Sequence, residues 1–289
     1  ASNSENIAES IAPTVDGGSV AGAMSASGQT LSVNNARIAS LRDGAAGQTG
    51  MVAGNLAEGL KAWGQVFGST AEQDRRDNVD GYEADTFGFA LGIDTETLAD
   101  NWIWGLSFAY ADTEVDSDNA NSTNTEIDSY QIGVYANYDW DERTYVSGQL
   151  AYVFGDNDSR RSNVGGIAGL TASGDYDSDQ VVARLEAGRN YSFNETTTVT
   201  PSVLLNYAYY DADSYTETGA GNAGLTVNSE AVSVLELGVG LDASWLYQQA
   251  DGCYLKPEVR AGVRYDFLDD EVEATSSFAG VAGTSFKTQ

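Results

Sequence analysis

From Ala62 onward, large apolar residues alternate with small, polar or charged ones. A period of two places successive side chains on opposite faces of a β-strand, so each such segment predicts a strand with two unlike faces. The segment 87–92 (FGFALG) illustrates the pattern. It recurs near 104–110, 130–138, 150–154, 181–185, 203–209, 235–241 and 259–265. With the turn residues between them, these segments predict about ten strands between Ala62 and Gly280.

The chemistry of the two faces distinguishes a membrane barrel from a soluble sandwich. One face is large and aromatic, whereas the other holds small residues and these charged ones: Arg184, Glu186, Glu236, Asp242, Glu258, Arg260 and Arg264. A sandwich would bury its aromatic face, but a membrane barrel turns that face to lipid and lines a wet lumen with the polar one. We therefore expect these side chains to face lipid: Phe87, Phe89, Leu91, Trp104, Leu106, Phe108, Ile132, Val134, Leu235, Leu237, Val239, Val259 and Val263.

The connections between the expected strands differ in length. The stretches 94–102, 138–144, 191–198 and 245–254 are short, whereas 112–129, 155–179 and 211–229 are long and acidic. Short turns on one side and long loops on the other are typical of outer-membrane barrels, and aromatic residues at strand ends such as Trp63, Phe67 and Trp140 fit interfacial girdles. We expect the acidic loops to lie at the cell surface.

Composition excludes several classes of function. The chain has no histidine and a single cysteine, Cys253, which excludes Ser-His-Asp and Cys-His catalysis and cysteine-based metal sites. The composition therefore argues against a barrel protease or lipase. With 43 acidic and 14 basic residues, the chain lacks the basic footprint of a nucleic-acid binder. Side-chain oxygens of Asp116, Asp118 and Asn119, and of residues 156–158, could bind calcium, but neither group has the twelve-residue calcium-loop pattern. We expect no metal, no cofactor and no small-molecule substrate.

The first sixty residues differ from the rest. Residues 1–29 are small, polar and glycine-rich, which predicts a flexible linker, whereas 31–43 fits a helical period and carries Arg37 and Arg42. Residues 51–60 could extend that helix or form a turn. A cationic helix would be held electrostatically inside an acidic lumen; the alternative is an ordinary surface helix.

Several segments resemble autotransporter β-domains in sequence and spacing over about 31–286. They are WGQVFGS (63–69), GYEADTFGFALGID (81–94), WIWGLSFAYADTEVD (102–116), DSYQIGVYANY (128–138), QLAYVFGDNDSRR (149–161), VTPSVLLNYAYYDADSYTETGAG (199–221) and LKPEVRAGVRYDF (255–267). The resemblance implies an all-β, antiparallel up-and-down transmembrane barrel of twelve strands with a helix in its lumen. It also implies the Gram-negative outer membrane, an N-terminal passenger, and the outer-membrane assembly machinery as a partner.

The resemblance gives the expected organisation of the chain. Residues 1–30 would be a linker from the passenger, 31–61 a helical or linker segment threading the pore, and 62–289 the barrel. The chain stops about two strands short of the family pattern, so we expect a further C-terminal piece or another chain to close the sheet. The expected function is passenger export and display; the alternative is a passenger-less outer-membrane pore or structural surface barrel.

Two further expectations concern the lumen. Asn34 and Asn35 resemble the paired asparagines at which some autotransporters cut themselves, although an ordinary polar helix surface explains them better, because the residues upstream of Asn34 are still present. The charged residues on the polar face would either hold the lumen helix and line a hydrated path, or pair with one another and stabilise the wall.

Overall fold

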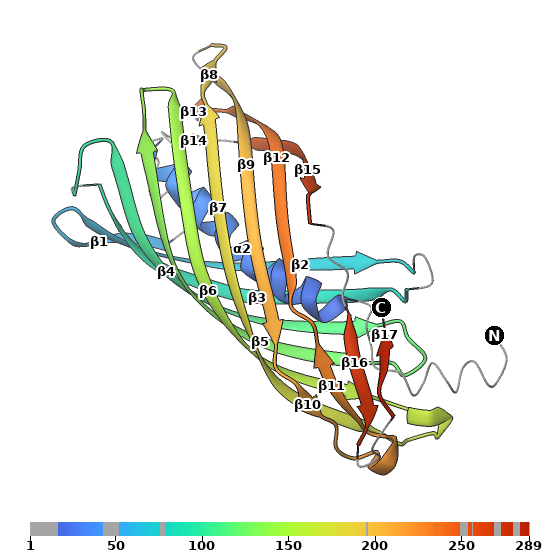
Figure 1. The fold of residues 1–289 in the computed structure, drawn as a ribbon. Coiled ribbons are helices and arrows are strands. Elements are labelled where there is room, and N and C mark those ends of the chain that lie inside the picture. Colours follow the sequence, from blue (N-terminus) through green and yellow to red (C-terminus); the bar gives the residue numbers. More distant parts are fainter. Residues whose placement is uncertain are drawn as a thin grey trace.

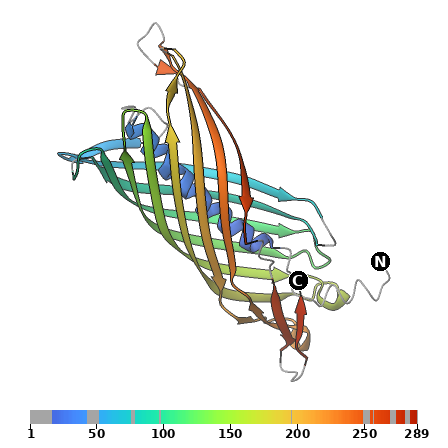
Figure 2. The same ribbon diagram turned by 45° about the horizontal axis from the view of Figure 1, so that its top comes forward.

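A computed structural model describes residues 17–42, 52–75, 79–96, 98–194, 196–248, 254–255, 257–268, 273–279 and 284–288. It consists of one long helix, α2 (Gly18–Arg42), and antiparallel strands. Among the described residues, no helix is both long and apolar enough to cross a membrane. Figures 1 and 2 show the main sheet curling around α2, which runs along its concave side. The all-β, up-and-down prediction is confirmed.

Within the described residues, the main sheet has 11 strands. Ten follow one another in space in chain order: β1 (Val52–Ala57), β2 (Leu60–Gln73), β3 (Tyr82–Thr95), β4 (Trp102–Ser117), β5 (Asn124–Asp139), β6 (Thr144–Arg161), β7 (Ala172–Arg189), β9 (Thr197–Ala212), β12 (Val232–Trp245) and β15 (Glu258–Asp266). The short β8 (Tyr191–Ser192) pairs with β9. Among the described residues, no strand pairing joins β15 to β1 or β2, so the sheet has two edges there.

Smaller elements lie at the two ends of the main sheet. β10 (Tyr215–Thr216), β11 (Leu225–Ser229), β16 (Ala274–Phe278) and β17 (Phe286–Thr288) form a four-stranded sheet at the long-connection end. β13 (Tyr247–Gln248) and β14 (Tyr254–Leu255) pair at the short-turn end. Two single-turn 3-10 helices, η1 (Val164–Gly166) and η2 (Gly221–Ala223), lie in long connections.

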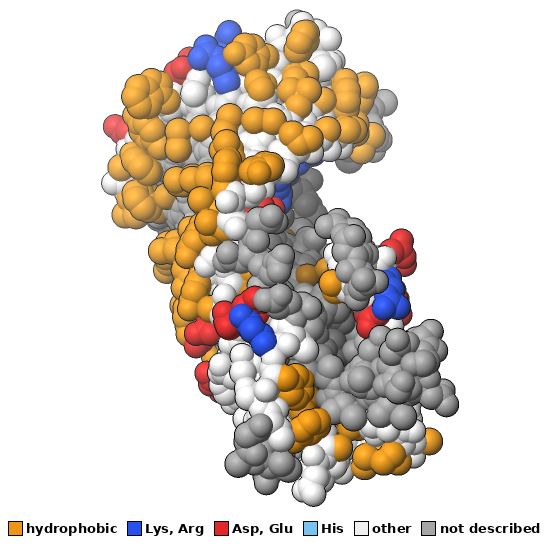
Figure 3. All heavy atoms as spheres, turned by 45° about the vertical axis from the view of Figure 1, so that its right-hand side comes forward, with side chains coloured by type: hydrophobic (Ala, Val, Ile, Leu, Met, Phe, Trp, Pro, Cys, Tyr) orange, Lys and Arg blue, Asp and Glu red, His pale blue; other side chains and the backbone are white. Residues whose placement is uncertain are grey.

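The two faces of the main sheet carry the side chains that the alternation assigns to them. Phe87 on β3 is 67% exposed and Ile132 on β5 is 65% exposed, whereas Ala90 and Ala109 on the concave face are buried. Every side chain expected to face lipid is exposed on the convex face except Leu235, which lies on that face but is half-buried. Figure 3 shows apolar side chains gathered over the outer surface, most densely in the upper part of that view.

The helix begins earlier than the sequence predicts. Residues 18–30, expected to be part of a flexible linker, form the first half of α2. They show no apolar period because their buried positions are small: Gly18, Gly22, Ala23, Ala26, Ser27 and Thr30. Small residues let the helix approach the wall, and a Cβ on Gly22 would lie 2.9 Å from the Val115 side chain. Close packing in the folded chain, rather than local periodicity, stabilises this part of the helix.

The segment expected to thread the pore over 31–61 is only partly helical. The helix ends at Arg42, and β1 (Val52–Ala57) is a strand of the main sheet paired with β2. A two-residue turn at Glu58–Gly59 joins them, and Gly59 adopts a positive φ of 74°, which glycine reaches without strain. The prediction of a helix or simple turn over 51–60 is therefore wrong, and the sheet begins before Ala62.

The acidic stretches expected to be loops are largely extensions of strands. β4 continues to Ser117 and β5 begins at Asn124, so much of 112–129 is a paired ladder. Thr113 and Val115 face inward and are buried, while Asp112, Glu114 and Asp116 point outward. Since the inward residues keep packing beyond the apolar band, the strands continue, and the prediction that these carboxylates lie in loops is wrong.

Candidate functional site

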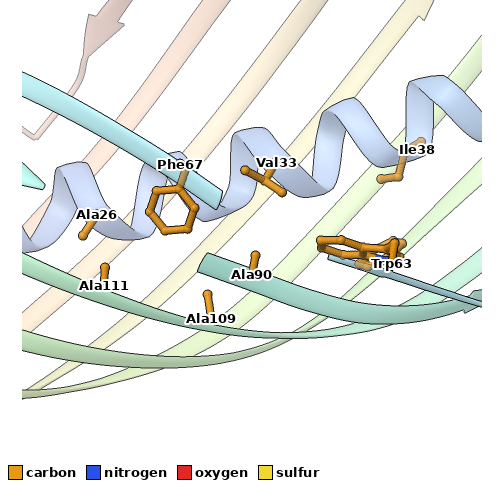
Figure 4. Packing of buried hydrophobic residues seen from close by; sticks show 9 residues of the cluster. Ala26, Val33, Ile38, Trp63, Phe67, Ala90, Ala109 and Ala111 are labelled. Carbon is orange, nitrogen blue, oxygen red and sulfur yellow. The ribbon is translucent and has the colours of Figure 1, made fainter. Parts of the chain in front are cut away.

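The candidate site is the interface between α2 and the concave face of the sheet. The helix packs against β2 to β6. Figure 4 shows Val33 and Ala26 of the helix facing Ala90, Ala109 and Ala111 of the wall. Because these wall residues are small, the helix lies close to the sheet, and its polar side chains reach wall groups directly. The expectation of a helix in the lumen matches this placement.

Arg37 is the central contact of the helix. Its Nε donates to Asp94 Oδ2 at 2.7 Å and its Nη2 donates to Asp94 Oδ1 at 3.0 Å. Both side chains are 0% exposed. The Tyr135 hydroxyl also donates to Asp94 Oδ2, at 3.1 Å, and itself accepts a hydrogen bond from Trp63 Nε1 at 2.8 Å. A buried arginine is thus paired bidentately with a carboxylate that two wall strands hold in place.

Glycines make room for the two aromatic rings of this network. A Cβ on Gly92 would lie 2.4 Å from the Trp63 indole, and one on Gly105 would lie 2.0 Å from the Tyr135 ring. Each ring therefore lies flat over a glycine of the neighbouring strand. Trp63 and Phe67 are buried in the lumen, so their assignment to an interfacial girdle is wrong. The alternation in the sequence could have predicted this placement, because it assigns both Asp94 and Trp63 to the face that carries the small residues.

The two asparagines of the helix contact different strands. Asn34 Nδ2 donates to the Ser107 hydroxyl at 3.1 Å, and Asn35 Nδ2 donates to Glu186 Oε2 at 2.8 Å. Asn34 is buried, and its Oδ1 has no hydrogen-bond partner among the described residues. Only Asn35 therefore contacts one of the lumen carboxylates that the sequence singled out.

Arg42 ends the helix beside the start of β6. Its guanidinium lies 3.4 Å from the centroid of the Tyr145 ring, a cation–π contact. The Tyr145 hydroxyl donates to Glu186 Oε1 at 2.6 Å. Glu186 therefore links two positions on the helix, Asn35 directly and Arg42 through the tyrosine. Of the predicted charged residues of the polar face, this is the one whose carboxylate bonds directly to α2 among the described contacts.

The remaining charges of the polar face pair mainly with one another. Arg260 Nε donates to Asp242 Oδ1 at 2.6 Å, and Arg264 Nη1 lies 3.6 Å from Glu236 Oε2. Arg184 donates to Asn206, which donates to Glu236 at 3.0 Å. Glu258 lies on β15, the strand that carries Arg260 and Arg264, opposite Ser244 of β12. This wall of β7, β9, β12 and β15 is the less covered side of the lumen, and its ion pairs join neighbouring strands.

The candidate calcium ligands do not converge. Asn157 points inward and donates to Ser178 and to backbone carbonyls, while Asp156 and Asp158 point outward. Asn119 Oδ1 accepts the backbone N–H groups of Asn121 and Thr123. Within the described part of the chain, no three side chains of the metal-binding types are placed to hold an ion.

The turn between β5 and β6, outside the membrane-spanning strands, contains an aspartate whose pKa is lowered. Asp141, in the turn between β5 and β6, accepts the backbone N–H groups of Arg143 and Thr144, and these bonds hold its pKa below the ordinary value for aspartate. The group stabilises a short turn rather than a site.

Comparison with known proteins identifies the family. The family model described as the autotransporter β-domain matches residues 62–289. Outer membrane protein A of Rickettsia conorii is 27% identical over 81% of this chain, and outer membrane protein B of Rickettsia prowazekii is 25% identical over 76% of it. The chain spans only 12% and 14% of the lengths of these two relatives.

Solved structures agree with the fold. The translocator domain of autotransporter NalP from Neisseria meningitidis superposes with a TM-score of 0.64 at 17% identity, covering 92% of each chain. The β-domain of the Bordetella autotransporter BrkA gives 0.55 at 18% identity, covering 75% of this chain and 86% of that one. The first is a translocator domain and the second an autotransporter β-domain, and both share the fold of this chain. The chain belongs to the autotransporter β-domain family, and it is a translocator domain of the Gram-negative outer membrane.

Proposed function

We propose that this domain anchors an N-terminal passenger and supports its export through the lumen that α2 occupies. The observation that carries the proposal is the direction of α2. Its first turn lies at the long-connection end, where Ser19 and Val20 line a cavity with Arg161 and Tyr215. Its last residue, Arg42, lies at the short-turn end against Tyr145. The chain therefore runs through the lumen from the long connections toward the short turns before it enters the sheet.

This direction supports export of a passenger toward the side of the long connections. Outer-membrane barrels carry long connections outside and short turns in the periplasm. A segment upstream of Gly17 would then leave the barrel at the cell surface, still joined to the domain through α2. The Arg37–Asp94 pair and the Glu186 contacts with Asn35 would hold this connecting helix in the lumen after export.

Accessibility of two epitope tags on intact cells tests the proposal. One tag is placed at the N-terminus and the other in the turn at Asp141–Glu142, between β5 and β6. We expect antibody to bind the N-terminal tag on intact cells and the turn tag only after permeabilisation. The reverse pattern would exclude export in this direction. The reading frame upstream of Ala1 distinguishes the two candidate functions. A long passenger region there would favour an exporter, whereas a signal peptide directly before Ala1 would favour a passenger-less pore or structural barrel.

The proposal includes two partners. Exposed apolar side chains of the convex face, such as Ile132, Val134 and Val263, would contact membrane lipid, and the family's assembly machinery would insert the barrel. Heat-dependent mobility on detergent gels tests insertion, because a folded barrel migrates differently before and after boiling. A depletion of the assembly machinery should abolish the unboiled, fast-migrating form.

Self-cleavage between Asn34 and Asn35 stays a prediction. The Asn35 amide bonds to Glu186 and the Asn34 amide to Ser107. Mass spectrometry of the chain purified from membranes tests it. A fragment that begins at Asn35 and disappears in Asn34→Ala would support cleavage; an intact chain under the same conditions would exclude it.

A further inference from the structure

A small folded unit lies over the first turn of α2. We call it the loop cap: residues 213–231, which include β10 and β11, together with β16 and β17. β11 pairs with β10 on one side and with β16 on the other, and β17 pairs with β16. Leu225, Val227 and Ala274 form a buried cluster within it. Figures 1 and 2 show it at the end of the sheet where α2 begins.

A buried ion pair joins the loop cap to the wall. Arg161, the last residue of β6, donates from Nε to Glu217 Oε1 and from Nη2 to Glu217 Oε2, both at 2.6 Å. Glu217 Oε2 also accepts the backbone N–H of Leu225 at 2.9 Å. The two side chains are 3% and 4% exposed. One carboxylate thus connects the barrel wall with both arms of the hairpin in the cap.

Two further contacts attach the cap to β7. The rings of Tyr176 and Tyr215 stack with centroids 4.6 Å apart at 11°. Ser173 and Thr218 exchange backbone hydrogen bonds of 2.9 and 2.8 Å. Gly174 leaves room for this docking, because a Cβ there would lie 2.4 Å from the Tyr215 ring. Burial, followed by the nearby Glu217 carboxylate, raises the pKa of the Tyr215 phenol well above its ordinary value.

The cap and the helix share one cavity. Ser19 and Val20 line it from α2, and Tyr215, Val227 and Ala274 line it from the cap. The adjacent Tyr210 belongs to the same buried cluster as Ala23 of α2. The cap therefore lies across this cavity from the first turn of α2.

We propose that the loop cap is a lid that closes the lumen mouth over the first turn of α2, with the Arg161–Glu217 pair as its lock. The inference rests on the proposed export function, since a passenger in transit must pass through the space that the cap now covers. A buried ion pair suits such a lock. Separating it partway leaves a charge buried without its partner, which is strongly unfavourable, so the pair favours fully engaged or fully hydrated states.

The lid can be tested by the reactivity of a cysteine beneath it. In a Cys253→Ser background, Val20→Cys is introduced and its labelling by a membrane-impermeant maleimide is timed on the folded barrel. Glu217→Gln should raise the labelling rate by at least about tenfold, because it unpairs the buried Arg161. Removing both charges, as Arg161→Met with Glu217→Gln, should return the labelling part of the way to the slow rate, because no lone charge stays buried. Asp141→Asn, at the opposite end, is the matched control and should leave the rate unchanged.

Two results would overturn the lid. One is labelling of Val20→Cys, in the Cys253→Ser background without any substitution in the cap, as fast as that of Ile167→Cys, an exposed position in a long connection. The other is an unchanged rate in Glu217→Gln while gel mobility shows a folded barrel. If Glu217→Gln does not insert, Tyr215→Ala, which loses the stack on Tyr176, carries the same prediction. The epitope-tag experiment is independent, so a failed lid and a failed export proposal are distinguishable.

Discussion

The buried Arg37–Asp94 pair allows a prediction with an internal control at Glu96, two residues after Asp94 in the chain. Lys61 and Glu96 form an ion pair of 2.5 Å, shorter than the 2.7 Å contact of Arg37 with Asp94. Its side chains, however, are 28% and 41% exposed, against 0% for both partners of the lumen pair. Distance alone would rank the exposed pair as the stronger one, whereas burial predicts the opposite order, so the two substitutions test the effect of burial.

Asp94→Asn should lower the free energy of unfolding by about 3–5 kcal/mol, because it leaves Arg37 buried without a counter-charge. Glu96→Gln should lower it by only about 0–1 kcal/mol, because water and salt screen an exposed pair. Since Asp94 also accepts from Tyr135, which in turn accepts from Trp63, tryptophan fluorescence reports on the same network.

The assay is urea unfolding of the refolded barrel in detergent micelles, followed by tryptophan fluorescence, with amide hydrogen exchange of α2 as a second measurement. Exchange in the helix should quicken in Asp94→Asn while the β-strands stay protected. Replacing both partners, as Arg37→Met with Asp94→Asn, should recover part of the loss, since no lone charge stays buried. Equal effects of Asp94→Asn and Glu96→Gln would refute the reasoning.

Three other substitutions probe the wall, the helix and the outer face. Gly105→Ala should destabilise the barrel by about 1–3 kcal/mol in the same urea assay, because its Cβ would overlap the Tyr135 ring; an unchanged midpoint would contradict the flat packing of that ring. Glu186→Ala should release Asn35 and lower the free energy of unfolding by about 1–3 kcal/mol. Amide hydrogen exchange should then quicken near the end of α2 but not at its start, and a uniform change along the helix would argue against a local contact. Leu106→Arg, on the exposed convex face, should cost about 2–4 kcal/mol in lipid vesicles if that position lies near the bilayer midplane, whereas Leu106→Ile should be nearly silent; equal stability of the two would place Leu106 outside the hydrocarbon.

The amino-acid sequence by itself determined the two faces of the sheet. Side chains alternate strictly along a strand, so a period of two assigns each residue to a face before any partner is known. For that reason Phe87, Ile132 and Val263 could be placed on the convex face and Arg184 and Glu236 on the concave one, as the structure has them. The resemblance to the autotransporter β-domain followed from the order and spacing of these segments, and the matching family model confirms it.

Only the tertiary structure decided which groups on the concave face meet. Arg37, Asp94 and Tyr135 come from a helix and two strands that are far apart in the chain, so no local pattern links them. Residues 18–30 likewise lack a helical period, because close approach to the wall requires small side chains rather than an apolar stripe. Trp63 entered the lumen because Gly92 leaves space for its ring. Alternation determines the face of a strand that a side chain occupies, but burial and pairing depend on the neighbour that the fold brings opposite it.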